Sequence, residues 1–440
     1  MAMHVTIISP GIYTYGAMLI GGIIREAGYP VTIRRELKAA YTDTVFLSLY
    51  STQHLLDPGI REFVKKHIEK GGKCYAGGPV SAYPEMVLGE LGCSGVVLGE
   101  GEKTVLSLLS GEITNLERGV AYENNGDQVI LPVSEPVSVE KRPIPLIPED
   151  IGSQDIRGAN VYIETHRGCL GACTFCQVPR FFGHAIRSRD SEDILQEVRA
   201  FKKKGVRRIS ISGGTGSLYR SVGNQLNPTA FIDLLAGISE IVGKNNLSAP
   251  DIRADCITGD ILEAIRNYTI GWIFFGIESG SDRILSLMGK GIKIARVSDA
   301  VAECRDHGLR VAGSFIVGYP TETDEDYTLT KDFISKESLD DVFISIAEPI
   351  PGTPLARMVL QTPEEKNPVF MPTTGEYRPL GLTVGEARCF DLMQHADMYK
   401  PGLHVITDPI YDAYLAEARK QGDDIRAVTG LLHRYYGTPE

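Results

Sequence analysis

The stretch RGCLGACTFC, residues 167–176, carries more information than any other part of this chain. It places Cys169, Cys173 and Cys176 in a C-x3-C-x2-C spacing, directly after NVYIET (160–165), an apolar run typical of a β-strand. Three thiolates so close together cannot all pair as disulfides. They can hold three corners of a four-iron–four-sulfur (4Fe–4S) cluster and leave one iron open for a further ligand. The spacing therefore predicts a cluster loop at the end of a strand.

A structural zinc site is the alternative for these three cysteines, with His166 or His184 as the fourth ligand. Zinc sites usually pair two C-x2-C units, and the sequence holds no second unit of this kind. The cluster is therefore the favoured interpretation.

Composition narrows the class of protein. The 440 residues suggest two or three domains, and no run approaches the eighteen or so apolar residues of a membrane span. The net charge is −11 and the longest basic block is Lys202-Lys203-Lys204, which opposes a nucleic-acid partner. The first residues enter a strand without the features of a signal peptide, and eight cysteines without a regular framework fit a reducing interior. We expect a cytoplasmic enzyme with no membrane or nucleic-acid partner.

Residues 1–135 are expected to form a doubly wound, Rossmann-like α/β domain, because short apolar runs alternate with helix-like stretches. The expected strands are HVTIIS (4–9), PVTIRR (30–35), TVFLSL (44–49), KCYAGG (73–78) and the start of GVVLGEGEKT (95–104), and the expected helices are AMLIGGIIREAG (17–28) and GIREFVKKHIEKGG (59–72). Ligands of such domains bind beyond the carboxyl ends of the strands, where glycines gather in this chain. Glycine placement alone leaves a nucleotide or another large ligand open.

Residues 136–158 form an expected linker that is rich in proline. Six β/α units then follow in residues 159–350 and predict a partial (β/α)6 barrel, open on one side, with chemistry at the carboxyl ends of its strands. The expected strands are VYIET, RISISGG, DIRADCI, WIFFGIES, VAGSFIVGYP and VFISIAEPIPG, and the helices begin near 191, 228, 258, 282, 294 and 323. Residues 351–440 are expected to be a small, mostly helical cap, with Ile425, Val428, Leu431 and Leu432 on one apolar stripe.

Arg253 is a candidate ligand-binding residue within the expected strand DIRADCI (251–257). Strand alternation would place Arg253, Asp255 and Ile257 on one face, from which the guanidinium could pair with a carboxylate of a ligand. A salt bridge with Asp255 is the equally weighted alternative. The remaining cysteines, which are Cys74, Cys93, Cys256, Cys304 and Cys389, need no chemistry and are expected to be small core residues.

The cysteine loop, with Phe175 between its last two cysteines and Arg167-Gly168 before the first, resembles the signature loop of the radical S-adenosylmethionine (SAM) superfamily. SGGTGS (212–217), GIESGS (276–281) and GSFIVGYP (313–320) follow in the order of that superfamily. The resemblance implies a 4Fe–4S cluster on the three cysteines and SAM as cofactor, although Thr215 stands where the family usually has glutamate. The implied SAM-binding residues are Phe175, Gly213, Gly214, Thr215, Arg253, Glu278, Val317 and Gly318.

The stretch GGPVSAYPEMVLGELGCSGVVLGEGEKTVLSLL (77–109) resembles the cobalamin-binding domain that precedes many radical SAM barrels. The chain has no D-x-H-x-x-G motif, so the resemblance implies a cobalamin whose lower face meets the loop after the third strand. His54 in that loop is either a candidate lower ligand or a hydrogen-bonding residue. The implied cobalamin-binding residues are Ser9, Pro10, Gly11, Leu49, Ser51, Thr52, Gln53, Gly77, Gly78, Pro79, Gly99, Glu100 and Gly101.

Together these resemblances imply a cobalamin-dependent radical SAM methyltransferase (class B). The order of the whole chain is most similar to the archaeal methyl-coenzyme M reductase glutamine C-methyltransferase of methanogens. That similarity implies methylation of an unactivated sp3 carbon in a glutamine side chain, through a 5′-deoxyadenosyl radical and methylcobalamin. The implied partners are a protein or peptide substrate, the reductase alpha subunit, and an electron donor such as ferredoxin or flavodoxin. The enzyme itself is expected to be a monomer.

Two other functions remain open for the same motifs. One is a radical SAM and cobalamin enzyme that acts on a small molecule or lipid. The other is a methylthiotransferase, whose cysteine loop is similar. That family carries three further cysteines before the loop, whereas this chain has only Cys74 and Cys93 there. A non-catalytic cluster or cobalamin sensor is disfavoured by the glycines and polar residues at several strand ends.

Overall fold

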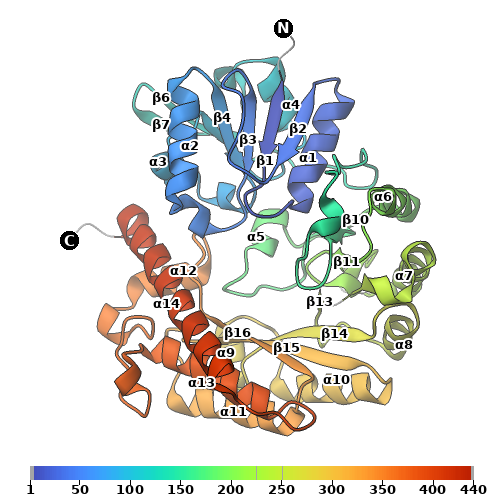
Figure 1. The fold of residues 1–440 in the computed structure, drawn as a ribbon, viewed down its shortest axis with the longest axis vertical. Helices are drawn as coiled ribbons and strands as arrows, with labels where there is room; N and C mark the ends of the chain where they lie inside the picture. The colour runs from blue at the N-terminus through green and yellow to red at the C-terminus, as the bar shows by residue number, and fades with distance from the viewer. Residues whose placement is uncertain (1–3, 224, 250, 438–440) are drawn as a thin grey trace. The chain divides into compact units, whose positions relative to one another are not determined.

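The computed structural model describes residues 4–223, 225–249 and 251–437. The chain forms two compact units and passes between them several times (Figure 1). Unit 1 comprises Met1–Gly168, Arg180–Gly213 and Gly237–Leu247, and unit 2 comprises Cys169–Pro179, Gly214–Ala236 and Ser248–Glu440. Each unit is therefore assembled from segments that are separated along the sequence.

Unit 1 contains a seven-stranded sheet in the order β2-β1-β3-β4-β5-β6-β7. The first five strands are parallel: β1 (Val5–Ile8), β2 (Val31–Arg34), β3 (Thr44–Ser48), β4 (Lys73–Gly77) and β5 (Gly95–Val97). All four residues of β1 are buried, as expected for a strand that is covered on both faces. The predicted doubly wound arrangement is confirmed.

Four helices cover this sheet: α1 (Tyr15–Glu26), α2 (Pro58–Glu69), α3 (Pro84–Leu91) and α4 (Thr104–Ser110). α1 contacts α4, and α2 contacts α3. In the sheet, β2 lies on one side of β1, whereas β3, β4 and β5 follow in order on the other side. Right-handed crossovers therefore place the two helix pairs on opposite faces of the sheet (Figure 1).

An antiparallel hairpin extends the sheet beyond β5. It consists of β6 (Val120–Asn124) and β7 (Asp127–Ile130), joined by Asn125 and Gly126. Both joining residues have positive φ, 52° and 91°, which is the conformation that favours Asn-Gly in two-residue hairpins. No strands were predicted here from the sequence, although Asn-Gly is a usable signal for a hairpin turn.

Unit 1 also contains a second, parallel sheet, in the order β12-β11-β8. β8 (Val161–Glu164) pairs with β11 (Ile209–Ser212), and β12 is Leu247–Ser248. α6 (Ser191–Lys203) lies between β8 and β11 along the chain and buries Ile194, Val198 and Phe201 on one face. β9 (His166–Arg167) and β10 (Arg187–Ser188) pair as a two-stranded antiparallel ribbon.

Unit 2 is built on a parallel sheet in the order β13-β14-β15-β16. The strands are β13 (Asp251–Ile252), β14 (Trp272–Glu278), β15 (Arg310–Val317) and β16 (Asp341–Ile346). The connecting helices are α8 (Gly259–Tyr268), α9 (Asp282–Leu287), α10 (Ile294–Asp306) and α11 (Asp324–Glu337). Each begins at, or one residue after, its predicted position. α7 (Pro228–Val242) precedes them at its predicted start.

The expected strand over 251–257 is wrong beyond its first two residues. β13 ends at Ile252, and a turn follows in which the Cys256 N–H donates to the Arg253 carbonyl at 2.8 Å. Strand alternation therefore does not set the direction of Arg253. The alternation of apolar Ile252, Ala254 and Cys256 with charged Arg253 and Asp255 fits a strand, but the backbone turns after Ile252.

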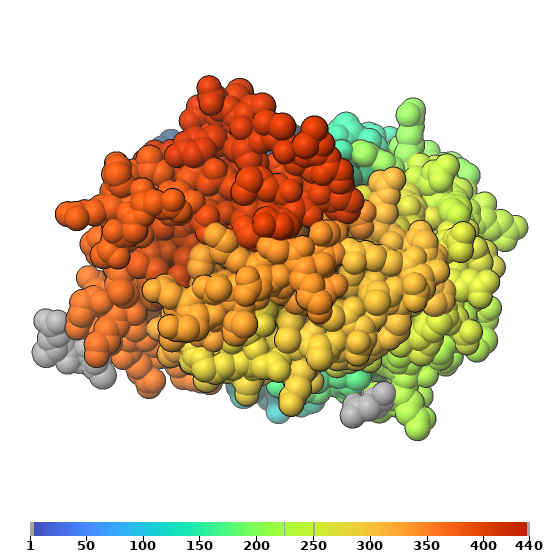
Figure 2. All heavy atoms as spheres, turned by 90° about the horizontal axis from the view of Figure 1, so that it is seen from below, coloured from blue at the N-terminus to red at the C-terminus, as the bar shows by residue number. Residues whose placement is uncertain are grey.

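Three helices complete unit 2: α12 (Pro354–Gln361), α13 (Val384–Met398) and α14 (Asp408–Tyr436). α13 and α14 contact each other and β16, and Figure 2 shows α14 in red on the surface of this region. Ile425, Val428, Leu431 and Leu432 are buried, so the predicted stripe on α14 is part of the core. Among the described residues, no helix combines the length and the apolar character needed to cross a bilayer.

Candidate active site

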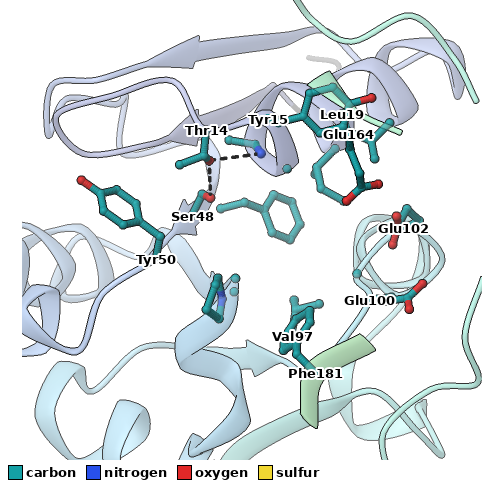
Figure 3. A pocket seen from close by; sticks show the side chains of 18 of the residues that line it. Thr14, Tyr15, Leu19, Ser48, Tyr50, Val97, Glu100, Glu102, Glu164 and Phe181 are labelled. Carbon is teal, nitrogen blue, oxygen red and sulfur yellow. Dashed lines mark hydrogen bonds between the residues drawn. The ribbon is translucent and has the colours of Figure 1, made fainter. Parts of the chain in front are cut away.

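A pocket of about 320 Å³ lies at the carboxyl ends of β1, β3, β4 and β5 in unit 1 (Figure 3). The strand order reverses between β1 and β3, which is where open α/β sheets bind their ligands. Leu19, Phe46 and Val97 give the pocket apolar walls. At its rim the Thr14 and Ser48 hydroxyls are hydrogen-bonded at 3.0 Å.

Six of the predicted cobalamin-binding residues line this pocket: Gly77, Gly78, Pro79, Gly99, Glu100 and Gly101. The other seven are not among its lining residues: Ser9, Pro10, Gly11, Leu49, Ser51, Thr52 and Gln53. Several of these have local partners instead. The Ser9 hydroxyl pairs with Thr14 at 3.1 Å, and the Thr52 hydroxyl pairs with the Tyr83 hydroxyl at 2.9 Å.

Gly78 shows why glycine occurs at the pocket edge. Its φ is +91°, and a Cβ there would lie 2.6 Å from the Leu49 carbonyl oxygen. Any other residue would push the loop after β4 away from the loop after β3. The glycine therefore keeps two walls of the pocket close together.

Tyr50, rather than His54, is the residue of the loop after β3 that lines the pocket. The His54 ring packs edge-on against the Tyr50 ring, with centroids 4.5 Å apart. Burial lowers the pKa of His54, so the imidazole is neutral at pH 7. A role of His54 as lower ligand stays a prediction.

Arg167 forms the charged wall of the pocket together with three glutamates (Figure 3 shows the glutamates). Its guanidinium contacts Glu100 at 2.8 Å, Glu102 at 2.6 Å and Glu164 at 3.0 Å. Arg167 is only 6% exposed, so these pairs are shielded from water. Its guanidinium also stacks over the Phe182 ring at 5.1 Å.

Two further arginines balance these carboxylates. Arg187 forms an ion pair with Glu100, and Arg142 forms one with Glu164. Burial opposes ionisation of Glu164, but the charges of Arg167 and Arg142 outweigh it and hold its pKa at about 2. The pKa of Glu100 is also lowered, because Arg187 and Arg167 outweigh the effect of burial. Three arginines thus neutralise three glutamates.

Several residues of this pocket wall were not predicted from the sequence. Arg167 was noted only for its place before the cysteines, and Phe181, Phe182, Tyr15 and Glu102 were not singled out. The Phe181-Phe182 pair, in α5 (Val178–Phe182) just after the cysteine loop, was the one usable signal. Ion pairs between residues so far apart in sequence leave no local pattern.

The cysteine loop lies in unit 2. Cys173 is buried, whereas Cys169 and Cys176 are partly exposed, and none of the eight cysteines forms a disulfide. The Gly171 N–H donates to Cys169 Sγ at 3.4 Å. A Cβ on Gly171 would lie 3.5 Å and 3.6 Å from the sulfurs of Cys169 and Cys173, so the loop curves around these sulfurs. Backbone N–H donation to sulfur is a usual feature of cluster sites.

These thiols fit an iron–sulfur cluster better than a single ion. Within the described residues, no three His, Cys, Asp or Glu side chains converge to hold one metal ion, so the zinc alternative gains no support. A 4Fe–4S cluster takes one thiolate per iron, so its ligands surround a body instead of meeting at a point. His166, one of the two candidate fourth ligands for zinc, packs against Gly213, and its Nδ1 pairs with the Thr165 hydroxyl at 2.9 Å.

Unit 2 anchors the cysteine loop through Thr174. Its N–H donates to the Met288 carbonyl at 2.8 Å, and its carbonyl accepts from Leu355 N–H at 3.1 Å. Its hydroxyl pairs with the Tyr319 hydroxyl at 2.8 Å. Phe175 packs against the apolar cluster that contains Tyr319 and Leu355. These contacts fix the position of Thr174 and Phe175 within unit 2.

Comparison with known proteins supports the interpretation of the cysteine loop as a radical SAM loop. Residues 163–334 match the model of the radical SAM superfamily. A Methanocaldococcus jannaschii protein named "Putative methylthiotransferase" is 53% identical over 439 residues, covering 98% of this chain and 96% of that protein. This chain belongs to the radical SAM superfamily. It is therefore a radical SAM enzyme, whose cofactors are a 4Fe–4S cluster and SAM.

Two more distant relatives have names that indicate different activities. A Pyrococcus horikoshii protein named "Uncharacterized methyltransferase" is 31% identical over 303 residues, covering 66% of this chain and 64% of that protein. A Shigella boydii tRNA-2-methylthio-N(6)-dimethylallyladenosine synthase is 31% identical over 213 residues, 48% of this chain and 45% of that protein.

Solved structures confirm the predicted fold class. The cobalamin-dependent SAM radical enzyme OxsB, with aqua-cobalamin and SAM bound, matches with a TM-score of 0.66 and 17% identity over 100% of this chain and 74% of that one. The radical SAM methyltransferase TsrM from Kitasatospora setae, with cobalamin and a [4Fe-4S] cluster bound, matches with a TM-score of 0.67 and 14% identity over 98% and 100%.

Glu278, the predicted ribose-binding residue of the radical SAM site, has a strained backbone. Its φ of +70° is uncommon outside glycine and is typical of functional positions. Its carboxylate contacts Lys290 Nζ at 2.9 Å and accepts from the Ser314 hydroxyl at 3.2 Å. A Cβ on Gly276 would lie 2.4 Å from this carboxylate, so the pair requires glycine there. Lys290 was not predicted from the sequence as a residue of this site.

Arg253 lies beside the radical SAM loop and forms a salt bridge with Asp255, the alternative given equal weight with ligand binding, at 2.9 Å and 2.8 Å. Its guanidinium also donates to the Lys290 carbonyl at 3.0 Å. Burial raises the pKa of Cys173, while the charges of Lys290 and Arg253 act in the opposite direction. Two cations thus stand near the buried thiol, and binding of SAM by Arg253 stays a prediction.

The other predicted SAM-binding residues lie at strand ends. Gly213 and Gly214 follow β11, and Thr215 is buried at the start of a short 3-10 helix. Val317 is the last residue of β15 and is buried. The Gly318 N–H donates to the buried carboxylate of Glu322 at 2.8 Å. These roles stay predictions.

Proposed function

We propose that this radical SAM enzyme is a cobalamin-dependent C-methyltransferase that methylates an unactivated sp3 carbon. The observation that carries the proposal is the pocket of unit 1, at the switch point of a doubly wound sheet, with glycines from β4 and β5 in its wall. OxsB and TsrM, which have the same fold, are both described with cobalamin bound.

The charges of the pocket favour cobalamin over a nucleotide. Among the described residues that line it, Arg167 is the single cation, and three glutamates already occupy its guanidinium. The Thr14 side chain caps the first turn of α1 by accepting from Ala17 N–H. Phosphates would therefore meet carboxylates rather than cations, whereas a neutral ring that carries amide groups can pack on the apolar walls and donate to those carboxylates.

The bound cofactors carry the hard chemistry: the cluster and SAM supply hydrogen abstraction, and cobalamin supplies the methyl group. The residues of this chain hold and orient them. Cys169, Cys173 and Cys176 would hold the cluster, and Thr174 keeps their loop fixed. Each methyl group transferred uses electrons from outside, so we also propose an electron donor such as ferredoxin or flavodoxin.

A methylthiotransferase is the second candidate, because the relative that is 53% identical bears that name. The two cysteines that precede the loop do not support it. Cys74 and Cys93 are 0% and 6% exposed in the core of unit 1. Neither is placed to hold a second cluster.

For the substrate we propose a glutamine-containing segment of the methyl-coenzyme M reductase alpha subunit, modified after translation. The support is the similarity of the whole chain to the archaeal glutamine C-methyltransferase. The net charge of −11 argues against tRNA, which favours basic surfaces. A small molecule or lipid is the remaining alternative.

The proposal is tested by anaerobic reconstitution with iron, sulfide and hydroxocobalamin, followed by SAM, reductant and the reductase peptide. We expect the peptide mass to increase by one CH2, with one 5′-deoxyadenosine and one S-adenosylhomocysteine formed per methylated peptide. A gain of CH2S would instead establish methylthiolation. Cleavage of SAM without a change in the peptide would refute this substrate.

The cluster assignment has its own test. Cys173→Ala should abolish SAM cleavage while the protein still binds cobalamin, because the residues that line the pocket lie in unit 1 and the cysteine loop lies in unit 2. Cys304→Ala is the matched control, since Cys304 is buried in α10 and should leave cleavage unchanged. Retained cleavage in Cys173→Ala would refute the assignment.

A further inference from the structure

Arg167 takes part in two features that the proposed function uses separately: the pocket of unit 1 and the backbone that leads into the cysteine loop. Its backbone is the last residue of β9 and is followed at once by Gly168 and the first cluster cysteine. Its side chain belongs to the pocket wall. The residue that leads into the cysteine loop is thus also a residue of the cofactor pocket.

The side chain uses all three guanidinium nitrogens for ion pairs. Nη1 contacts Glu100 at 2.8 Å, Nη2 contacts Glu102 at 2.6 Å, and Nε contacts Glu164 at 3.0 Å. Glu100 and Glu102 belong to the Gly-Glu-Gly-Glu loop after β5, whereas Glu164 ends β8. One guanidinium therefore fixes the β5 loop to the strand that precedes the cysteines.

The three glutamates depend on Arg167 to different degrees. Glu100 also pairs with Arg187, and its carboxylate accepts from Val137 N–H at 3.2 Å. Glu164 also pairs with Arg142. Among the described residues, Glu102 forms one ion pair, with Arg167. Loss of Arg167 would therefore release Glu102 first, and with it the edge of the pocket.

The backbone of Arg167 is fixed as firmly as its side chain. It pairs with Arg187 in the β9–β10 ribbon. Gly168, with φ +99°, lies so close to the Ala185 carbonyl oxygen that a Cβ would be 2.2 Å from it. A shift of the β5 loop would therefore be passed through the guanidinium to a rigid piece of backbone, which continues directly into the cysteine loop.

We propose that Arg167 is a positioning residue that couples occupancy of the pocket to stability of the cluster. A ligand that contacts the Gly-Glu-Gly-Glu loop fixes Glu100 and Glu102, and these fix the chain that enters the cysteine loop. Coupling of this kind is reciprocal, so a built cluster also tightens binding in the pocket. The inference rests on the proposed function, because the ligand in the pocket is cobalamin.

The test compares iron loss from the reconstituted full-length enzyme with and without hydroxocobalamin. A ferrous chelator is added anaerobically under reducing conditions, and the rate of iron release is followed by absorbance. For the wild type we expect bound cobalamin to slow release by at least about fivefold. For Arg167→Gln we expect cobalamin to bind but the two rates to become equal. Arg208→Gln is the control, since Arg208 forms an exposed pair with Asp155 and should keep the wild-type ratio.

The outcomes separate the coupling from the proposed function. A wild type that retains no cobalamin after gel filtration would overturn the proposed function. Cobalamin on every protein, with the same ratio of rates in Arg167→Gln as in the wild type, would overturn the coupling alone. If Arg167→Gln does not fold, Glu102→Gln decides: it removes one of the three ion pairs at constant volume, a smaller ratio supports the coupling, and an unchanged ratio refutes it.

Discussion

Gly168 illustrates how one residue controls the approach to the cluster. Its φ is +99°, and the Ala185 carbonyl occupies the place of a side chain. Gly183, in the same region, also has a positive φ of +77° but has open space around it. The two glycines separate the effect of backbone strain from that of a steric clash.

We expect Gly168→Ala to destabilise the enzyme by more than about 2 kcal/mol and to lower iron content after reconstitution. Gly183→Ala should cost about 1 kcal/mol, because it adds only the unfavourable φ. Urea unfolding and iron analysis of both variants measure this difference. Equal effects of the two substitutions would show that the contact with Ala185 does not matter.

Glu164 predicts how stability depends on pH. Its pKa is held at about 2, below its value in the unfolded chain, by Arg167 and Arg142, while Arg189 donates to its carbonyl oxygen. A lowered carboxylate pKa stabilises the fold above the unfolded value near 4.3, and this stabilisation is lost as pH falls towards 2.

The corresponding contribution at neutral pH is about 3 kcal/mol. Glu164→Gln should therefore make the free energy of unfolding less dependent on pH between 4.5 and 2, besides lowering it at pH 7. Urea titrations across this range test the prediction, with Glu149→Gln at an exposed ion pair as control. A pH dependence equal to that of the wild type would contradict it.

At the scale of elements, the sequence predicts regular structure well where periodicity is strong. The helices that begin at Ser191, Asp282 and Ile294 start at the predicted positions. It fails where long-range pairing decides. β13 stops after two residues, and the β6–β7 hairpin exists because the edge of β5 is available for antiparallel pairing. The end of β13 has no local signal, whereas the hairpin has one in Asn125-Gly126 but also needs the free edge of β5.

The candidate site shows the same division. The cysteine loop and the glycines after β4 and β5 are local patterns and were predicted. The Arg167 network and the Lys290–Glu278 pair arise from residues that meet only in the folded chain, and so they were missed. Glu278 was predicted by its motif, but its positive φ was not.

The start of α13 gives a prediction for an element. Glu386 forms a capping box with Thr383 and also pairs with Arg426 of α14 at 2.8 Å. We expect Glu386→Ala to lower the free energy of unfolding by about 2 kcal/mol, since both the cap and the ion pair are lost. Glu386→Gln keeps the cap and should cost clearly less. Urea unfolding followed by circular dichroism compares the two, and equal losses would assign the whole effect to the ion pair.

At the scale of the whole molecule, the proposed cofactor should stabilise the two units unequally. Hydroxocobalamin at about 100 times its dissociation constant adds about 2.7 kcal/mol to the state that binds it. We expect slower amide hydrogen exchange in unit 1, around β1, β3, β4 and β5, and little direct change in the outer helices of unit 2. ATP at the same concentration is the control and should have no effect. Protection by ATP would favour the nucleotide interpretation of the pocket.

The interleaving of the two units bears on how the protein is made. Unit 1 needs residues up to Leu247, but the chain first supplies the cysteine loop of unit 2. At about 5–20 residues per second, several seconds of translation separate β8 from its partner β11. During that time Val161 and Ile163 lack the neighbouring strand that covers them in the native state. The nascent chain therefore presents an unpaired apolar strand to chaperones. Because Phe181 and Ser212 line the pocket, binding of the proposed cofactor is expected to follow synthesis of this region.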